Sequence, residues 1–217
     1  HSKDNDSETK VVVCEMKGIG LTGGIASGKS TVSKILGELG AIIIDGDLTA
    51  HRLMEPYQPT WEDIVLEFGR EILNSDLTID RVKLGAIVFN DREKLTVLIQ
   101  ITHPRIIAEV QNEMQHLRHT QPDSVLVLDI PLLFEGRMDR LCDQVWVVWV
   151  PREIQIERLM DRNWLSREEA IKRIDAQMSL DAKARLADIV IDNSGTMEET
   201  MIQVVKYYGA IAGQSMS

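Results

Sequence analysis

Cysteine, aromatic residues and long apolar runs are all scarce in this chain of 217 residues. The two cysteines, Cys14 and Cys142, form no CxxC pair, so no disulfide framework is predicted and both are expected to be free thiols in a reducing compartment. Aromatic residues make up 5% of the chain, which predicts an aliphatic core. The longest apolar run, residues 145–150, is too short to cross a bilayer. These absences predict a cytoplasmic protein without a membrane partner.

Positively charged residues are also fewer than negatively charged ones, with 24 lysine and arginine residues against 34 aspartate and glutamate residues. The net charge of −10 argues against a nucleic-acid partner, which would need a basic surface. A local basic pocket for a small anionic ligand is still compatible with this charge. The polar residues 1–15 lack the apolar centre of a signal peptide, and we interpret them as a tag remnant or disordered extension, with Met16 as a candidate natural start.

Short aliphatic runs alternate with amphipathic stretches along the chain, a pattern typical of a parallel sheet covered by helices. Several of these runs are almost continuously apolar, as expected of strands buried on both faces. The segment from Gly28 to Leu39 has the apolar spacing of a helix, and Gly40 is a suitable end for it. The five predicted strands are residues 18–22, 41–45, 125–130, 144–150 and 188–192.

Two insertions interrupt this alternation. The first, residues 60–120, has no strand signal and is predicted to be helical, with helices at 60–69, 80–89, 93–101 and 104–117. The second, residues 160–187, is rich in charge and contains a capping box in which Ser166 is the N-cap and Glu169 the third helical residue. The nucleotide-binding core would then consist of residues 16–59, 121–159 and 188–212.

The stretch from Gly23 to Ser30 satisfies the complete pattern G-x-x-x-x-G-K-[ST] between a predicted strand and a predicted helix. Glycines let backbone N–H groups converge on phosphate, and the helix directs the positive end of its dipole at the same anion. Lys29 can reach the β- and γ-phosphates of ATP, and the Ser30 hydroxyl can ligate Mg²⁺. This pattern predicts a bound nucleoside triphosphate but specifies no reaction. The predicted phosphate-binding residues are Gly23, Gly24, Ile25, Ala26, Ser27, Gly28, Lys29, Ser30 and Thr31.

Carboxylates follow two of the predicted strands. Asp45 and Asp47 come at the end of the second strand, and in an extended segment they would share one face. Strand ends are where ligands bind in such sheets, so a carboxylate there could accept a proton or orient Mg²⁺, although D-G-D is also good turn chemistry. Asp129 ends the third strand and could hold Mg²⁺ through water, or could simply cap the following loop.

Seven segments together resemble the dephospho-CoA kinase family: GLTGGIASGKSTV, IIIDGDLTAH, LTIDRVKLGAIVF, THPRI, VLDIPLLFE, QIERLMDR and ADIVIDNSG. The resemblance covers about residues 17–208. It implies a three-layer α/β P-loop kinase fold with a five-stranded parallel sheet, a helical acceptor-binding insertion and a lid. It also implies transfer of the γ-phosphate of ATP to the ribose 3′-hydroxyl of dephospho-CoA. The chain departs from the family pattern at Ala26, where the family usually has glycine, and at Gly46, where it usually has alanine.

The resemblance assigns roles residue by residue. It implies that Asp47 is the catalytic base, that Arg158 meets the transferred phosphate and that Asn193 lies near the adenine. Arg162 lies four residues beyond Arg158, at the start of the implied lid. Without the resemblance, an arginine pair of this kind is more typical of a solvated helix face. His103 comes before a proline that is interpreted as a helix start, and such a histidine is more typical of a buried structural contact. The acceptor-site candidates are Thr22, Asp47, Arg81, His103 and Leu132.

Three alternatives differ in testable sequence features. A nucleoside or nucleotide kinase would share the phosphate loop and the lid but not the full order of segments. A guanine-selective switch would carry an N-K-x-D stretch, and a transport ATPase subunit an L-S-G-G-Q type signature; neither occurs in the sequence. We therefore expect an enzyme that uses ATP, Mg²⁺ and dephospho-CoA, as a monomer or weak homo-oligomer.

Overall fold

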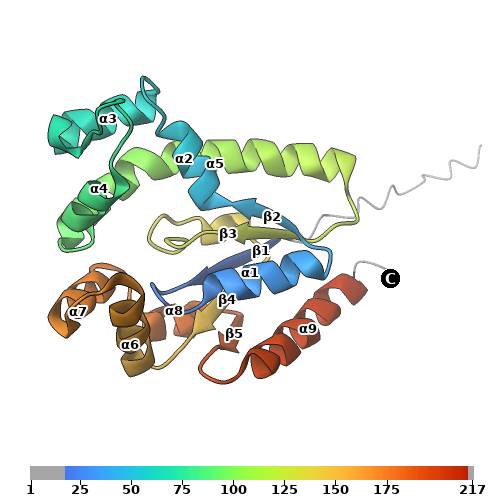
Figure 1. Ribbon diagram of the computed structural model, residues 1–217. Helices are drawn as coiled ribbons and strands as arrows, with labels where there is room; N and C mark the ends of the chain where they lie inside the picture. The colour runs from blue at the N-terminus through green and yellow to red at the C-terminus, as the bar shows by residue number, and fades with distance from the viewer. Residues whose placement is uncertain (1–17, 215–217) are drawn as a thin grey trace, which may run out of the picture.

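The computed structural model describes residues 18–214, and its centre is a parallel sheet with the strand order β2-β3-β1-β4-β5 (Figure 1). All five predicted strands are confirmed, with ends that differ by at most one residue. The predicted N-terminal extension, with Cys14 and Met16, lies outside the described residues. The strands are β1 (Gly18–Gly23), β2 (Ile42–Asp45), β3 (Leu126–Asp129), β4 (Gln144–Trp149) and β5 (Ile189–Asp192).

Helices cover both faces of the sheet and make a three-layer structure. Side chains alternate along each strand, so in β3 Leu126 and Leu128 face one core cluster while Val127 faces the other. One face packs against α5 (Arg92–Thr120) and α8 (Leu180–Leu186), the other against α1 (Lys29–Glu38) and α9 (Met197–Gln214). Each fully buried leucine or valine stabilises this arrangement by about 2 kcal/mol relative to an exposed one. The core is largely aliphatic, as predicted.

Gly20, in the central strand, lets the loops after β3 pack closely against the sheet. A Cβ at this position would lie 2.9 Å from Leu133 Cδ2 and 2.8 Å from Cys142 Sγ. Cys142 is a free thiol, as predicted. Burial, with smaller contributions from Asp139 and Asp143, raises the pKa of Cys142 to about 12. The thiol therefore remains protonated and serves as a packing group.

The first insertion forms a helical arm beyond one end of the sheet (Figure 1). Its helices α3 (Pro59–Phe68) and α4 (Arg81–Val88) enclose a small core of their own with the first part of α5. The prediction of separate helices at 93–101 and 104–117 is wrong, because α5 runs unbroken through Pro104. Proline removes only its own N–H from the helix, and the buried residues on both sides of it, among them His103 and Ile106, keep the helix in place.

The second insertion contains α7 (Arg167–Ala176) and follows α6 (Arg152–Asn163). The predicted capping box is confirmed, since the Ser166 side chain accepts from Glu169 N–H and the Glu169 carboxylate accepts from Ser166 N–H. Helices α6 and α7 share an apolar cluster that also touches Ile25 and Ala26 of the phosphate loop. By contrast, Leu180 of α8 belongs to the core of the sheet. None of the helices in residues 18–214 combines the length and apolar character needed to span a bilayer.

Candidate functional site

The glycine-rich loop that joins β1 to α1 contains close approaches that only glycine permits. Gly28 has a φ of 88°, in the left-handed region, and a Cβ there would collide with the amide of Asn193. A Cβ at Gly23 would collide with the Ser27 hydroxyl. Helix α1 then begins at Lys29 with no side-chain cap and no acidic residue in its first turn. The positive end of its dipole is therefore free to attract an anion.

Ala26 stands where the resemblance predicts glycine, and the structure shows that the difference matters. Its φ of 61° lies in the left-handed region, which is uncommon for a residue with a side chain. The backbone at Ala26 is consequently strained, by a cost on the order of 1 kcal/mol. Next to it, the Ser27 hydroxyl is buried without a hydrogen-bond partner among the described residues. An unpaired buried hydroxyl fits a loop whose polar groups serve a ligand.

Two buried or half-buried amides hold the loop from outside. The Gln155 side chain, in α6, donates to the Ile25 carbonyl at 2.8 Å, and the Asn193 side chain donates to the Ser27 carbonyl at 2.9 Å. Asn193 also accepts from the Thr200 hydroxyl at 2.8 Å, so its amide is engaged on both sides. The structure thus places Asn193 against the phosphate loop; its proximity to adenine stays a prediction.

Arg158 and Arg162 lie on α6, as predicted, but their surroundings differ. Arg158 is half-buried and donates to the Asn193 carbonyl at 3.0 Å, and its guanidinium lies close to Gly28. Arg162 is exposed and donates to the neighbouring Asn163 side chain at 2.9 Å. The structure therefore brings Arg158, but not Arg162, to the phosphate loop.

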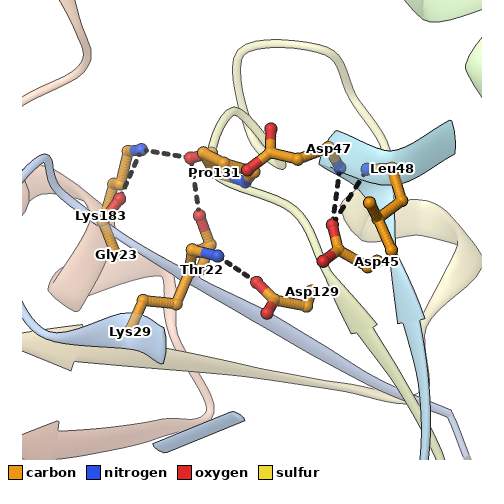
Figure 2. Close-up of polar contacts among 9 residues, drawn as sticks. All are labelled: Thr22, Gly23, Lys29, Asp45, Asp47, Leu48, Asp129, Pro131 and Lys183. Atoms are coloured by element: carbon orange, nitrogen blue, oxygen red, sulfur yellow. Dashed lines mark hydrogen bonds and ion pairs between the residues drawn. The ribbon is translucent and has the colours of Figure 1, made fainter. Parts of the chain in front are cut away.

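Lys29 forms an ion pair with Asp129, which ends β3 (Figure 2). The contact joins the phosphate loop to the next strand, so the two carboxyl ends of β1 and β3 share one site. Ser30 follows Lys29 in the first turn of α1, and its exposed hydroxyl has no hydrogen-bond partner among the described residues.

Asp45 and Asp47 do not share the face of an extended segment, and that expectation is wrong. A helix, α2 (Gly46–Leu53), begins directly after β2, and the Asp45 carboxylate caps it by accepting from the N–H groups of Asp47 and Leu48 at 2.8 and 3.1 Å. Figure 2 shows the Asp45 carboxylate turned back to this helix and the Asp47 carboxylate pointing away from it. Asp45 Oδ1 is thus occupied by the helix cap, whereas the Asp47 carboxylate is directed away from the helix. Aspartate before a helical stretch is a cap signal that could have predicted α2.

The electrostatic surroundings of Asp47 suit a proton acceptor. Burial raises the pKa of its carboxyl, the neighbouring Asp45 and Asp129 charges act in the same direction, and Lys29 and Arg81 oppose them. The side chain nevertheless stays accessible to solvent. A carboxylate with a raised pKa is a better base than an ordinary one. The influence of Lys29 also means that Asp47 and the phosphate loop act in one electrostatic environment.

A pocket of about 260 Å³ opens beside Asp47, between α2, α4, α5 and the loop after β3. Four of the five predicted acceptor residues line it: Asp47, Arg81, His103 and Leu132. The fifth, Thr22, is fully buried and donates to the Pro131 carbonyl at 2.9 Å, so it supports the wall of the pocket from behind. The walls are mainly apolar, which suits an organic acceptor more than a bare anion.

His103 lies in the wall of this pocket as a neutral imidazole. It is buried, and burial lowers its pKa to about 4. Its Nδ1 has no hydrogen-bond partner within residues 18–214 and faces the backbone of Gly136, where a Cβ would collide with the ring. The close packing of His103 on Gly136 couples α5 to the loop after β3.

Lys183, in α8, is a site residue that sequence reasoning missed. Its ammonium is fully buried and donates to the carbonyls of Gly23 and Pro131, each at 3.0 Å (Figure 2). It also forms an ion pair with Glu135 at 3.2 Å. Burial lowers the pKa of Lys183, while the Glu135 carboxylate opposes that shift. The available signal was its position, because Leu180, Lys183 and Ala184 have the spacing of one helical face, which placed the lysine in an apolar stripe.

The described residues contain no group of three or more histidine, cysteine, aspartate or glutamate side chains that could hold a metal ion. Oxygen donors suited to Mg²⁺ are present in the Ser30 hydroxyl and the Asp129 carboxylate.

Comparisons with known proteins agree with this geometry. The family model for dephospho-CoA kinase matches residues 17–199. A dephospho-CoA kinase from Carboxydothermus hydrogenoformans is 54% identical over 187 residues, which are 86% of this chain and 90% of that protein. Another, from Symbiobacterium thermophilum, is 49% identical over 198 residues, which are 91% of this chain and 82% of that protein.

Solved structures show the same relationship. Dephospho-CoA kinase from Campylobacter jejuni has a TM-score of 0.65 and 33% identity, over 91% of this chain and 98% of that one. TT1252 from Thermus thermophilus has a TM-score of 0.73 and 33% identity over the same shares. Shikimate kinase from Acinetobacter baumannii, with 19% identity and a TM-score of 0.50 over 93% of this chain and 96% of that one, shares the fold alone. The predicted P-loop kinase fold is confirmed.

Proposed function

The chain belongs to the dephospho-CoA kinase family, and we propose that it transfers the γ-phosphate of ATP to the 3′-hydroxyl of the ribose in dephospho-CoA, the last step of coenzyme A synthesis. One observation carries the proposal for this chain's own residues. Asp47 has a raised pKa and lies at the mouth of an apolar pocket, within the electrostatic influence of the phosphate-loop lysine, Lys29. A base, an acceptor pocket and a phosphate loop are thus combined in one site.

The phosphate loop would bind ATP through its backbone. The residues from Gly23 to Thr31 would present N–H groups to the phosphates, and the uncapped first turn of α1 would add the positive end of its dipole. Lys29 would exchange its ion pair with Asp129 for the more highly charged phosphates. Positioning and charge neutralisation supply most of the catalysis in phosphoryl transfer.

The residues beside the loop fit a magnesium ion that is bound together with ATP. The Ser30 hydroxyl would be a direct ligand, and Asp129 would hold the ion through water once Lys29 has turned to the phosphates. When bound, Mg²⁺ neutralises phosphate charge.

Asp47 would accept the proton of the 3′-hydroxyl as that oxygen attacks the γ-phosphorus. The carboxylate points away from its own helix, and its raised pKa favours proton transfer near neutral pH. Arg158, beside Gly28, would place its planar guanidinium against the transferred phosphate. Arg162 would join it when α6 and α7 close over the nucleotide, and such closure excludes water that would otherwise take the phosphate.

The three parts of the fold would divide the work. Residues 16–59, 121–159 and 188–212 would form the nucleotide-binding core, residues 60–120 the acceptor-binding arm and residues 160–187 the lid. Within the last range, α8 is packed in the core of the sheet and would stay in place when the lid closes. Asn193 would lie near the adenine, and the pocket lined by Arg81, His103 and Leu132 would hold part of the acceptor. A monomer or weak homo-oligomer and a cytoplasmic location stay predictions, as does the absence of a nucleic-acid partner.

The test is ADP release from ATP with and without dephospho-CoA, together with identification of the phosphorylated product. We expect release that depends on dephospho-CoA and is nearly abolished in Lys29→Met, whose thermal unfolding without ligand should stay close to that of the wild type. Slow hydrolysis that is indifferent to the acceptor would instead indicate a nucleotide-dependent switch. Equal turnover of simple nucleosides or nucleotides would indicate a nucleotide kinase.

A further inference from the structure

A second hollow, of about 650 Å³, adjoins the acceptor pocket. The two share Ile99 and His103 of α5, so this part of the helix forms a wall between them. The other sides of the second hollow are the loop from Glu135 to Arg140 and the residues around the end of α7. The hollow therefore lies beside the acceptor site, where the arm meets the second insertion.

Three arginines line this second hollow: Arg92, Arg137 and Arg140. Within residues 18–214 their guanidinium groups form no ion pair and no hydrogen bond, whereas Arg105 and Arg152 each pair with an aspartate. The one carboxylate in the lining belongs to Glu135, which is already paired with Lys183. The hollow thus presents three uncompensated positive charges in a chain whose net charge is −10.

The loop holds Arg137 in an unusual conformation. Its φ of 54° lies in the left-handed region, and the turn is fixed by bonds from Gly136 N–H to the Leu132 carbonyl at 2.9 Å and from Met138 N–H to the Leu133 carbonyl at 2.8 Å. Met138, next to it, is fully buried. A strained backbone persists only where its surroundings impose it, and such positions are concentrated at ligand sites. The loop therefore keeps Arg137 at the hollow instead of leaving it to relax.

The acceptor of the proposed reaction contains a group that matches this charge. In dephospho-CoA a diphosphate joins the adenosine, which carries the reacting 3′-hydroxyl, to the pantetheine chain. The apolar pocket beside Asp47 has one arginine in its lining, Arg81, whereas the neighbouring hollow has three. Arginine binds phosphate oxygens through paired, charge-assisted hydrogen bonds. We propose that the hollow lined by Arg92, Arg137 and Arg140 binds the diphosphate of dephospho-CoA, an inference that rests on the proposed function.

The experiment compares two ligands that differ in the diphosphate. The KM for dephospho-CoA is measured at saturating ATP in Arg92→Gln, Arg137→Gln and Arg140→Gln. The inhibition constant of adenosine, which lacks the diphosphate, is measured against dephospho-CoA in the same variants. We expect each variant to raise the KM for dephospho-CoA about ten- to hundredfold, because it loses one charge-assisted contact. The inhibition constant of adenosine should stay within twofold of the wild-type value.

The matched control is Arg118→Gln, an exposed arginine at the far end of α5, which should change neither constant. Thermal unfolding of every variant checks the fold, and Arg137→Lys should recover part of the loss by restoring charge. An unchanged KM for dephospho-CoA in all three variants would overturn the inference. If the wild type still phosphorylated dephospho-CoA, the proposed function would stand. Equal losses for both ligands would also overturn the inference. Failure of the wild type to phosphorylate dephospho-CoA would refute the proposed function itself.

Discussion

The Lys183 ammonium donates to the carbonyl oxygen of Gly23 across 160 residues of sequence. Because a peptide group is planar, a fixed Gly23 carbonyl also fixes the Gly24 N–H, which points to the opposite side. The same ammonium donates to Pro131, in the wall of the acceptor pocket. One buried charge therefore holds the start of the phosphate loop and the acceptor wall in a fixed relation.

Lys183→Met should destabilise the protein by about 3–5 kcal/mol, because it leaves the Glu135 carboxylate buried without its partner. Urea unfolding measures this loss. Adding Glu135→Gln should recover part of it, since the unpaired charge is then removed. The control is Lys34→Met, an exposed lysine of α1, which should stay within about 0.5 kcal/mol of the wild type. Equal effects of the two lysine variants would refute this account.

Asp47→Asn should lower kcat by about 10²–10⁴-fold, because the amide keeps the shape of the carboxylate and cannot accept the proton. Binding of dephospho-CoA, measured by calorimetry, should change much less. Asp45→Ala should instead lower the free energy of unfolding by about 1 kcal/mol, since it removes the cap of α2. A kcat that falls further in Asp45→Ala than in Asp47→Asn would reverse these assignments.

Arg158→Lys should reduce kcat at least about tenfold, because an ammonium cannot form the paired hydrogen bonds of a guanidinium with the transferred phosphate. The KM for dephospho-CoA should change less than kcat. Steady-state kinetics at saturating ATP give both constants, with exposed Arg185→Lys of α8 as the control. A wild-type kcat would limit Arg158 to its structural contact with the Asn193 carbonyl.

Ala26→Gly should stabilise the protein by up to about 0.5 kcal/mol. Glycine removes the cost of a left-handed φ, which exceeds the entropy that it adds to the unfolded chain. Ala86→Gly, at an exposed helical position of α4, should have the opposite sign and cost about 0.5–1 kcal/mol. Chemical denaturation measures the free energy of unfolding of both variants. A loss of stability in Ala26→Gly would contradict the inference that the backbone at Ala26 is strained.

The pH dependence of stability should contain a contribution from His103. Its folded pKa of about 4 is lower than its ordinary value of 6.5, so between these values the unfolded chain binds the extra proton. The contribution of His103 to the free energy of unfolding is therefore fully present above pH 6.5. It is lost as the pH drops toward 4, by at most about 3 kcal/mol.

Urea unfolding at pH 7.0 and pH 4.5 tests this contribution. His103→Gln should lose less stability over that interval than the wild type, while His116→Gln, exposed on the same helix, should follow the wild type. The same loss in all three proteins would exclude His103 as its source.

The strands and the phosphate loop could be predicted because their signals are local. An apolar run such as residues 144–150 and the glycine–lysine pattern around Gly28 determine structure within a few residues of themselves. The signal for the start of α2 is equally local, but an extended segment at Asp45 and Asp47 predicts a shared face, while the resemblance singles out Asp47 alone as the base. The structure separates them into a helix cap and a free carboxylate.

The remaining differences come from contacts between distant residues. Pro104 predicts a break between two helices, with the second beginning at the proline, yet packing on both sides of it keeps α5 continuous. Lys183 lies in a charged segment, and only its burial against Gly23 and Pro131 distinguishes it from an exposed lysine. The spacing of residues along one helix contains no information on such partners.

Pro104 divides helix α5 into two parts that are packed in different cores. Leu95 is anchored in the arm and Val110 in the sheet, and Pro104 lies between these anchor points, where one backbone bond is missing. The stretch from Arg92 to Pro104 spans about 18 Å, so a bend of about 10° at the proline would move Arg92 by about 3 Å. The proline adjoins His103, in the wall that the two hollows share. Because this part of the helix separates the two hollows, a small rotation there would widen one hollow as it narrows the other.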